Sequence, residues 1–192
     1  MLEHLNQLAL DLRAVFADCG HPRVPALLAD WPGATSVPVP SALPVLGSLS
    51  RLPAQPGDLG TQLMALSSAL RWQQTYTAKD FGPVFLDRYG WTLLVGPKGP
   101  VACTSNLAGF LLLGPGIEYP VHQHAAEEAY VVVAGTASWK IGAADWAPLP
   151  PGSVVHNPPW QAHGMRTDQG TPLLLAFLWR AGAVEKSRFR PS

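Results

Sequence analysis

Charged residues and cysteines are both scarce in this chain of 192 residues. Only 14% of the residues are charged, whereas a typical soluble domain has about 25%. The 13 basic and 13 acidic residues cancel, so a polyanionic partner such as nucleic acid is not expected. The two cysteines, Cys19 and Cys103, lie far apart. This spacing supports neither a disulfide framework nor a zinc ribbon and favours reduced thiols in the cytoplasm.

Long hydrophobic runs are absent as well, since no stretch approaches the roughly 18 apolar residues of a membrane span. The first residues carry Glu3, His4, Asp11 and Arg13 among their apolar positions. A secretory signal instead has a basic start and an uninterrupted apolar stretch, so neither a signal peptide nor a membrane partner is expected. The sequence predicts a cytoplasmic protein. Its low charge and 47% hydrophobic residues are compatible with a surface that is covered in a homodimer.

The first part of the chain predicts helices. Leucines from Leu2 to Leu12 recur largely at helical spacing, and Gly20 with Pro22 provides a stop. A second short helix is expected over 24–31, and a third over 59–77 with Leu63, Leu66 and Leu70 on one face. The segment between them, 32–56, is rich in proline and is expected to be an irregular connector.

From residue 85 the sequence pattern changes to short apolar runs separated by Gly and Pro, such as WTLLVG, EAYVVVAG, ASWKIG and PLLLAFLWRAG. Such runs predict an antiparallel barrel or sandwich. We therefore expect a mainly β protein with two parts. Residues 1–84 form a helical extension that packs on the barrel, and residues 85–192 form the barrel that carries the chemistry.

Four side chains of the barrel region form a candidate metal site. His122 and His124 are separated by one residue, so on a strand both imidazoles leave the same face. Glu128 follows after a bend, and His163 is expected from a neighbouring strand. These ligands suit a divalent ion of iron, zinc, manganese or nickel and do not choose among them. His156, seven residues before His163, is interpreted as a core or rim histidine bonded to backbone, and its role stays open.

The spacing of these residues resembles that of the cupin family. The run Gly116-x5-His122-x-His124-x3-Glu128-x6-Gly135 matches the first cupin motif at every position. The second motif is also present, with its ligand at His163, as Gly152-x5-Pro158-x-Trp160-x2-His163-x3-Thr167. In that motif Trp160 and Thr167 replace the usual glycine and asparagine. The resemblance implies a cupin barrel, which is a jelly-roll-like double-stranded β-helix.

Two tyrosines flank the first motif. Tyr130 lies two residues after Glu128 and therefore shares its strand face, while Tyr119 lies three residues before His122. A phenol has a pKa near 10, and a neighbouring dication favours the phenolate. Tyr130 is thus a candidate base. The alternative, a tyrosine that lines the barrel and only hydrogen-bonds, has equal weight.

A closer resemblance covers about 71–182. The string YPVHQHAAEEAYVVVAGTASWKIG, followed by HNPPWQAHGMRT and PLLLAFLWRAG, resembles the cupin-type dimethylsulfoniopropionate (DMSP) lyases and their lyase-like relatives. RWQQTYT, FLDRYGWTLLVGPKG and AGFLLLGPG are similar to the preceding segments of that family. The resemblance implies a carbon–sulfur lyase that cleaves DMSP to acrylate and dimethyl sulfide by β-elimination. It also implies a metal at the four positions named above and Tyr130 as the proton acceptor.

The expected partner is therefore a small molecule with a carboxylate and a sulfonium group. Aromatic faces attract such a soft cation by about 0.5 to 2 kcal/mol each. The candidate rings, of which no more than two are expected to act, are Tyr76, Tyr89, Trp91, Trp139 and Trp179, with Trp160 considered beside them.

Two other functions stay open on the sequence alone. The same ligands serve cupin dioxygenases or isomerases that act on other small carboxylic acids, and a non-catalytic sensor could hold the metal structurally. Tyr119 and Tyr130 favour the lyase over an oxygenase, which delivers oxygen from the metal and needs no phenolic base. A structural metal site is usually closed by four protein ligands, so an open coordination position beside a cavity would argue against the sensor.

Overall fold

The computed structural model describes residues 1–53, 55, 57–180 and 187–189. Its helices are α1 (Leu2–Ala17), α2 (Leu59–Leu66) and α3 (Pro83–Asp87), with 3₁₀ helices η1 (Val24–Leu27), η2 (Pro44–Arg51) and η3 (Ser67–Ala69). Its strands are β1 (Trp72–Gln73), β2 (Tyr89–Val95), β3 (Asn106–Leu113), β4 (Glu118–Gln123), β5 (Glu128–Ala134), β6 (Ala137–Ile141), β7 (Ala147–Leu149), β8 (Val154–Asn157), β9 (His163–Thr167), β10 (Leu173–Arg180) and β11 (Arg188–Phe189).

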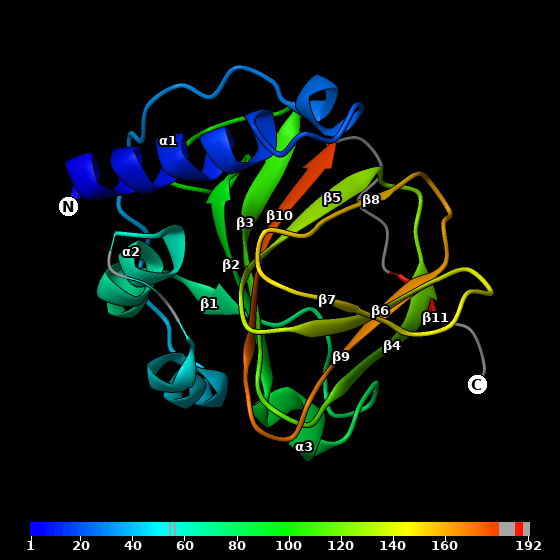
Figure 1. Ribbon diagram of the computed structural model, residues 1–192. Coiled ribbons are helices and arrows are strands. Elements are labelled where there is room, and N and C mark those ends of the chain that lie inside the picture. Colours follow the sequence, from blue (N-terminus) through cyan, green and yellow to red (C-terminus); the bar gives the residue numbers. More distant parts are fainter. Residues whose placement is uncertain (54, 56, 181–186, 190–192) are drawn as a thin grey trace.

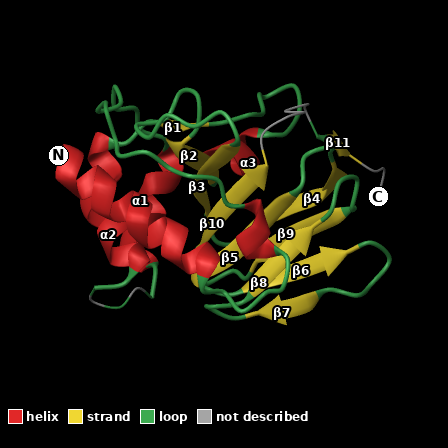
Figure 2. Ribbon diagram, turned by 90° about the horizontal axis from the view of Figure 1, so that it is seen from above, coloured by secondary structure: helices red, strands yellow, loops and turns green. Residues whose placement is uncertain are grey.

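Two antiparallel sheets face each other and enclose the interior of a barrel, while α1 and α2 lie along the outer side of one of them (Figure 1 and Figure 2). The six-stranded sheet has the order β1-β2-β3-β10-β5-β8, and the five-stranded sheet has the order β11-β4-β9-β6-β7. Within the part of the chain that the structure describes, every helix is too short or too polar to cross a bilayer. The mainly β architecture with an N-terminal helical part is confirmed.

The central strands of the larger sheet are buried on both faces. On β3, Phe110 and Leu112 belong to the core beneath the helices, whereas Leu111 and Leu113 point into the barrel. Strand β10 alternates in the same way between the two cores. A strand that is covered on both faces has a continuous run of apolar residues instead of alternating apolar and polar ones. This explains the sequences FLLL and LLLAFL. The helical extension therefore supplies one of the two cores.

The helix predicted near the N-terminus is confirmed. Helix α1 ends at Ala17, and Gly20 has a positive φ of 70°, as expected for the residue that turns the chain away from a helix. Its buried residues, Leu5, Leu8, Leu12 and Phe16, recur at three- and four-residue steps and form one face. This face packs against α2 and the outer side of the larger sheet.

The helix predicted over 59–77 is wrong in its second half. Helix α2 ends at Leu66, and the chain then continues through η3 into β1. The amide of Trp72 donates to the carbonyl of Ser41, and its indole N–H donates to the carbonyl of Ser67. These long-range bonds and the burial of Trp72 outweigh the helical periodicity. Because β1 pairs with β2, the sheet begins before residue 85.

Two other segments differ in detail from the expectation. The helix expected over 24–31 is the single 3₁₀ turn η1. The connector 32–56 is not wholly irregular, because it contains the 3₁₀ helix η2. Val45 and Leu49 of η2 are buried in the outer core, and this anchoring holds a proline-rich segment in a regular turn.

Asn106 connects the extension to the barrel. Its carbonyl oxygen accepts hydrogen bonds from the Ala29 amide (2.7 Å) and the Trp31 indole (2.8 Å), and its amide donates to the Leu27 carbonyl (2.9 Å). The side chain is fully buried. Its removal would leave two donors and an acceptor without partners.

We therefore expect Asn106→Ala to lower the free energy of unfolding by about 2 to 4 kcal/mol, since each buried unsatisfied group costs about 1 to 3 kcal/mol. Urea denaturation followed by tryptophan fluorescence measures this. The exposed neighbour Ser105 provides the control, because Ser105→Ala should change stability by less than about 0.5 kcal/mol. Equal stability of the two variants would contradict the anchoring role.

Candidate metal centre

Three histidines converge at one end of the barrel. His122 lies on β4, His124 directly follows that strand, and His163 begins β9. Strands β4 and β9 pair with His122 opposite His163, as expected for ligands on neighbouring strands. All three side chains are buried, and one ring nitrogen of each lies within 4.8 Å of the others. The fold thus forms a group that could hold a metal ion.

Backbone carbonyls orient the three imidazoles. Nδ1 lies 2.8 Å from the Pro120 carbonyl in His122, 3.0 Å from the Ala126 carbonyl in His124 and 2.8 Å from the Gln161 carbonyl in His163. Because a carbonyl oxygen only accepts, each Nδ1 carries a hydrogen. The remaining nitrogen, Nε2, is therefore available as a metal ligand, in the arrangement that is usual for metal-binding histidines.

Glu128, on β5, lies beside two of these histidines but is not one of the three residues whose ligand atoms converge within 4.8 Å. Its Oε1 lies 2.8 Å from His163 Nε2, and its Oε2 lies 3.3 Å from His124 Nε2. Among the buried polar atoms of the described residues, His124 Nε2, His163 Nε2 and Glu128 Oε2 make no hydrogen bond. Ring lone pairs that face a carboxylate need a cation between them, either a proton or a metal ion. This donor set fits a divalent ion.

The electrostatics of the site favour a cation. Burial alone would raise the pKa of Glu128, but the neighbouring His163 and His124 outweigh it and hold that pKa far below its ordinary value. Burial opposes a charge on His163, yet the Glu128 carboxylate raises the pKa of His163. Burial and the charge of His163 lower the pKa of His122 to about 3. A proton and a metal ion therefore compete for the same negative site.

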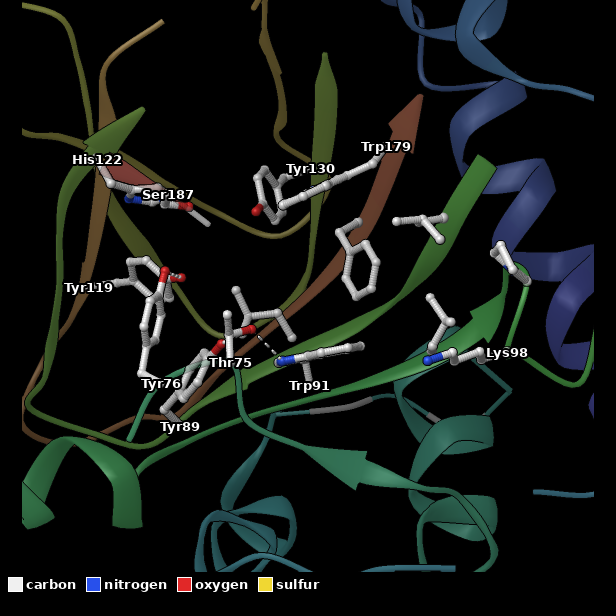
Figure 3. Close-up of a pocket in the computed structure, with 15 residues that line it drawn as sticks. Thr75, Tyr76, Tyr89, Trp91, Lys98, Tyr119, His122, Tyr130, Trp179 and Ser187 are labelled. Carbon is white, nitrogen blue, oxygen red and sulfur yellow. Dashed lines mark hydrogen bonds between the residues drawn. The ribbon is translucent and has the colours of Figure 1, made fainter. Parts of the chain in front are cut away.

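A cavity of about 530 Å³ adjoins His122, which is the one residue of the histidine group among its lining residues (Figure 3). Its walls include the inward-facing residues of β2 together with Tyr119, His122, Tyr130 and Trp179. The hydroxyl groups of Tyr76 and Tyr119 lie 2.7 Å apart, and the ring of Tyr119 lies 4.7 Å from that of His122. Solvent-sized space therefore reaches the candidate metal centre, as a site that binds a substrate requires.

The comparisons with known proteins agree with this geometry. The model of the dimethylsulfoniopropionate lyase family matches residues 23–175, which is most of the chain. The chain belongs to the DMSP lyase family. The match begins well before the barrel, so the family resemblance extends over much of the helical extension.

One relative in the DMSP lyase family is similar to this chain in both sequence and structure. The DMSP lyase DddQ of Ruegeria pomeroyi is 34% identical over 117 residues, which cover 61% of this chain and 58% of DddQ. The aligned part thus spans little more than half of that relative. A crystal structure of DddQ superposes with a TM-score of 0.83 and 25% identity over 98% of this chain and 97% of the other.

Superposition on solved structures also identifies the fold. One described as that of the DMSP lyases RdDddP and RnDddQII superposes with a TM-score of 0.81 and 31% identity, covering 99% of this chain and 97% of the other. A cupin-2 domain, Rru_A2000 of Rhodospirillum rubrum, is 16% identical with a TM-score of 0.52 over 64% of this chain and 76% of the other. That likeness concerns the fold alone, and the predicted cupin fold is confirmed.

In this member of the DMSP lyase family, most of the residues singled out in the sequence line the cavity, namely Tyr76, Tyr89, Trp91, Tyr119, Tyr130 and Trp179. Trp139 is not among the lining residues. It is buried behind them, with its ring 5.3 Å from that of Tyr130. Trp160 lies outside the cavity lining, half exposed with a φ of 63° and the guanidinium of Arg188 over its ring.

His156 lies outside the metal centre. Its Nε2 is 2.9 Å from the carboxylate of Glu127, so its partner is a side chain rather than the backbone group that was expected. Its ring also lies 5.4 Å from that of His21, in the segment after α1. This contact joins the extension to the barrel and does not involve the three converging histidines.

Three residues of the site were missed in the sequence. Asn157, which lies inside the second motif directly before Pro158, is buried and donates to Glu128 Oε1 at 2.9 Å. Its place within the motif was a usable signal, since buried carboxylates need hydrogen-bond partners. Thr75 and Lys98 line the cavity but lie in segments without any motif. Their contribution depends on the tertiary fold.

Asn157 holds the Glu128 carboxylate in place, and we expect Asn157→Ala to weaken metal binding. Loss of an outer-shell partner of a metal ligand typically costs 10- to 100-fold in affinity. Competition with a chromogenic chelator measures the change. Gln161→Ala is the matched control, because among the described residues the side-chain amide of Gln161 donates only to the Ala162 carbonyl, at 3.3 Å. An affinity of Asn157→Ala equal to that of the control would contradict the role.

Proposed function

We propose that this protein cleaves DMSP to acrylate and dimethyl sulfide by β-elimination, with Tyr130 as the proton acceptor. The observation that carries the proposal is the cavity, which joins Tyr130, an aromatic wall and the edge of the histidine cluster. Membership of the DMSP lyase family supports the choice of substrate. The presence of Tyr119 and Tyr130 in this cavity favours a lyase over an oxygenase, which needs no phenolic base.

We further propose that His122, His124, Glu128 and His163 hold one divalent ion. When bound, the ion would act as a Lewis acid that stabilises negative charge on the substrate carboxylate. The donor set of three imidazoles and one carboxylate leaves its identity among iron, zinc, manganese and nickel open. The lining residue His122 marks where the substrate carboxylate approaches this centre.

The position of Tyr130 supports its proposed role as the acceptor of the α-proton. Its side chain lies on the same strand face as Glu128, and its hydroxyl faces the side of the cavity on which His122 lies (Figure 3). Burial and the Glu128 carboxylate raise the pKa of Tyr130 well above its usual value. Positive charge at the histidine cluster acts in the opposite direction and favours the phenolate. Cation binding and base activation are therefore coupled.

The elimination balances without a further reactant. The proton on the carbon next to the carboxylate moves to Tyr130, and the electron pair of that C–H bond forms the new double bond. The C–S bond breaks with its electrons on sulfur, so the sulfonium leaves as neutral dimethyl sulfide. Tyr130 must then release its proton before the next turnover.

Aromatic rings on the cavity wall can receive the sulfonium. The ring of Trp179 stacks on His124 at 4.7 Å, and the ring of Trp91 contacts Phe177 edge to face at 6.4 Å. Both indoles line the cavity, and each cation–π contact contributes about 0.5 to 2 kcal/mol. Because dimethyl sulfide is neutral, this attraction disappears on cleavage, which assists release of the product.

A headspace assay tests the proposed reaction. The protein is loaded with each of the four metals in turn and incubated with DMSP, and dimethyl sulfide is measured by gas chromatography while acrylate is measured in solution. Equal amounts of the two products are expected with at least one metal. Absence of both products with every metal, at confirmed metal occupancy, would overturn the proposal.

We also propose a homodimer in the cytoplasm, with residues 1–84 acting in stability rather than in chemistry. The support is the low charge of the chain and the large apolar core that the extension shares with the barrel. Light scattering after size-exclusion chromatography tests the dimer. A monomer at micromolar concentration would contradict it.

A further inference from the structure

The cavity is larger than DMSP requires. Its volume of about 530 Å³ has room for about 18 groups the size of a water molecule, each of about 30 Å³. DMSP has about eight non-hydrogen atoms, and cavities of roughly 300 to 1,000 Å³ are typical of larger ligands. Space therefore remains after one DMSP molecule is placed beside the histidines.

Lys98 and His122 lie on opposite sides of the cavity (Figure 3). Among the described residues that line the cavity, Lys98 alone carries a permanent positive charge. Its ammonium has no hydrogen bond or ion pair with any described residue, and Figure 3 shows the amine pointing toward Trp91. Lys98 is solvent-exposed, so its charge stands at the mouth of the apolar cavity, where it can meet an anionic group of a bound ligand.

The backbone around Lys98 is held in place. In the tight turn after β2, Gly96 donates to the Val101 carbonyl at 2.9 Å and Val101 donates to the Leu94 carbonyl at 3.0 Å. The carbonyl of Pro100 in addition accepts from the amide of Thr35 at 3.0 Å. The turn is thus tied to the extension, so the side chain projects from a fixed position.

Thr75 holds the indole of Trp91 from the other side (Figure 3). Its Oγ1 accepts from the Trp91 indole N–H at 3.0 Å and from the Tyr89 hydroxyl at 3.3 Å. An indole N–H can only donate, so the Thr75 oxygen acts as an acceptor in this contact. Thr75 also lines the cavity, so it fixes the orientation of the Trp91 ring on the cavity wall.

We propose that Lys98 forms a second, carboxylate-binding subsite beside Trp91, while Thr75 holds the indole from its opposite side. The cavity then binds linear acids that are longer than DMSP and carry an anionic group at each end. The proposal rests on the proposed function only in placing one carboxylate near His122. It does not depend on cleavage of a carbon–sulfur bond.

The register of the sheet sets the length of such a ligand. Glu128 lies opposite Trp179, and Trp179 lies opposite Leu107 on the next strand. The turn that carries Lys98 follows on β2, one strand further. With strands about 4.8 Å apart, the turn is roughly 14 Å from the backbone of Glu128, and the side chains shorten the gap. Acids of about six to ten carbons span this distance.

Calorimetric titration of the metal-loaded protein tests the subsite. Linear dicarboxylates of about four to ten carbons are compared with monocarboxylates of the same carbon number. Burying a second carboxylate in an apolar cavity weakens binding unless the charge is paired. At the matching length we instead expect the dicarboxylate to bind about threefold to tenfold more tightly, and no such advantage at four carbons.

Two variants and a control locate the effect. Lys98→Met should remove the preference for the dicarboxylate, and Thr75→Val should reduce it, with unchanged affinity for the monocarboxylate in Lys98→Met. Lys140→Met is the control, because Lys140 lies on β6 next to the inward-facing Trp139 and outside the cavity lining. It should keep the full preference.

The proposal is overturned if the monocarboxylate binds at least as tightly at every length, or if the preference survives in Lys98→Met. Its failure is distinct from failure of the lyase reaction. Dimethyl sulfide production without dicarboxylate preference would remove only the subsite, whereas dicarboxylate preference without dimethyl sulfide would remove only the proposed reaction.

Discussion

Replacement of Tyr130 by phenylalanine is expected to lower kcat for DMSP cleavage by roughly 10²- to 10⁴-fold, the range typical of the loss of a general base. Phenylalanine keeps the ring that packs 5.3 Å from Trp139 and removes only the ionisable oxygen. Folding and metal content should therefore stay close to those of the unchanged protein. Steady-state kinetics together with metal analysis of the same samples measure both quantities.

Tyr119→Phe is the matched comparison. The Tyr119 hydroxyl is paired with that of Tyr76 at 2.7 Å, and burial together with the neighbouring tyrosines raises the pKa of Tyr119 well above its usual value. These contacts suit a residue that orients the substrate or the base, so Tyr119→Phe should cost less activity than Tyr130→Phe. A larger loss in Tyr119→Phe, with nearly normal turnover in Tyr130→Phe, would transfer the base role to Tyr119.

Replacement of His124 by alanine is expected to abolish metal binding at stoichiometric concentrations, and dimethyl sulfide production with it. His124 supplies one of three converging nitrogens, and its ring also stacks on Trp179. The change thus removes a ligand and loosens one wall of the cavity. Plasma mass spectrometry of the purified protein gives the metal content, and a chelator should lower the Tm of the unchanged protein but not that of the variant.

His156→Ala separates this effect from a general loss of histidine. His156 is also largely buried, but it pairs with Glu127 outside the converging group. Its variant should retain the metal and most of the activity, with a modest loss of stability. Full metal content in His124→Ala, or loss of the metal in His156→Ala, would show that the ligands have been assigned incorrectly.

Much of this architecture is predictable because its signals are local. The spacing of His122, His124 and Glu128 is a property of one strand and the bend after it, and the apolar runs mark the strands of the barrel. Amphipathic periodicity likewise predicts α1. Periodicity failed at 67–77, where long-range contacts of Trp72 place the chain in a sheet rather than a helix.

The sequence by itself therefore determined the type of fold, the four candidate ligands and the two tyrosines, because each depends on residue type and short spacing. Only the tertiary structure decided which aromatic rings reach the cavity. It placed Trp91 and Trp179 on the wall and Trp139 behind it. It also placed Asn157 beside Glu128, and Lys98 and Thr75 around Trp91. These neighbours come from strands and turns far apart in the chain, and their contacts follow from sheet register and strand order, which short-range patterns do not contain.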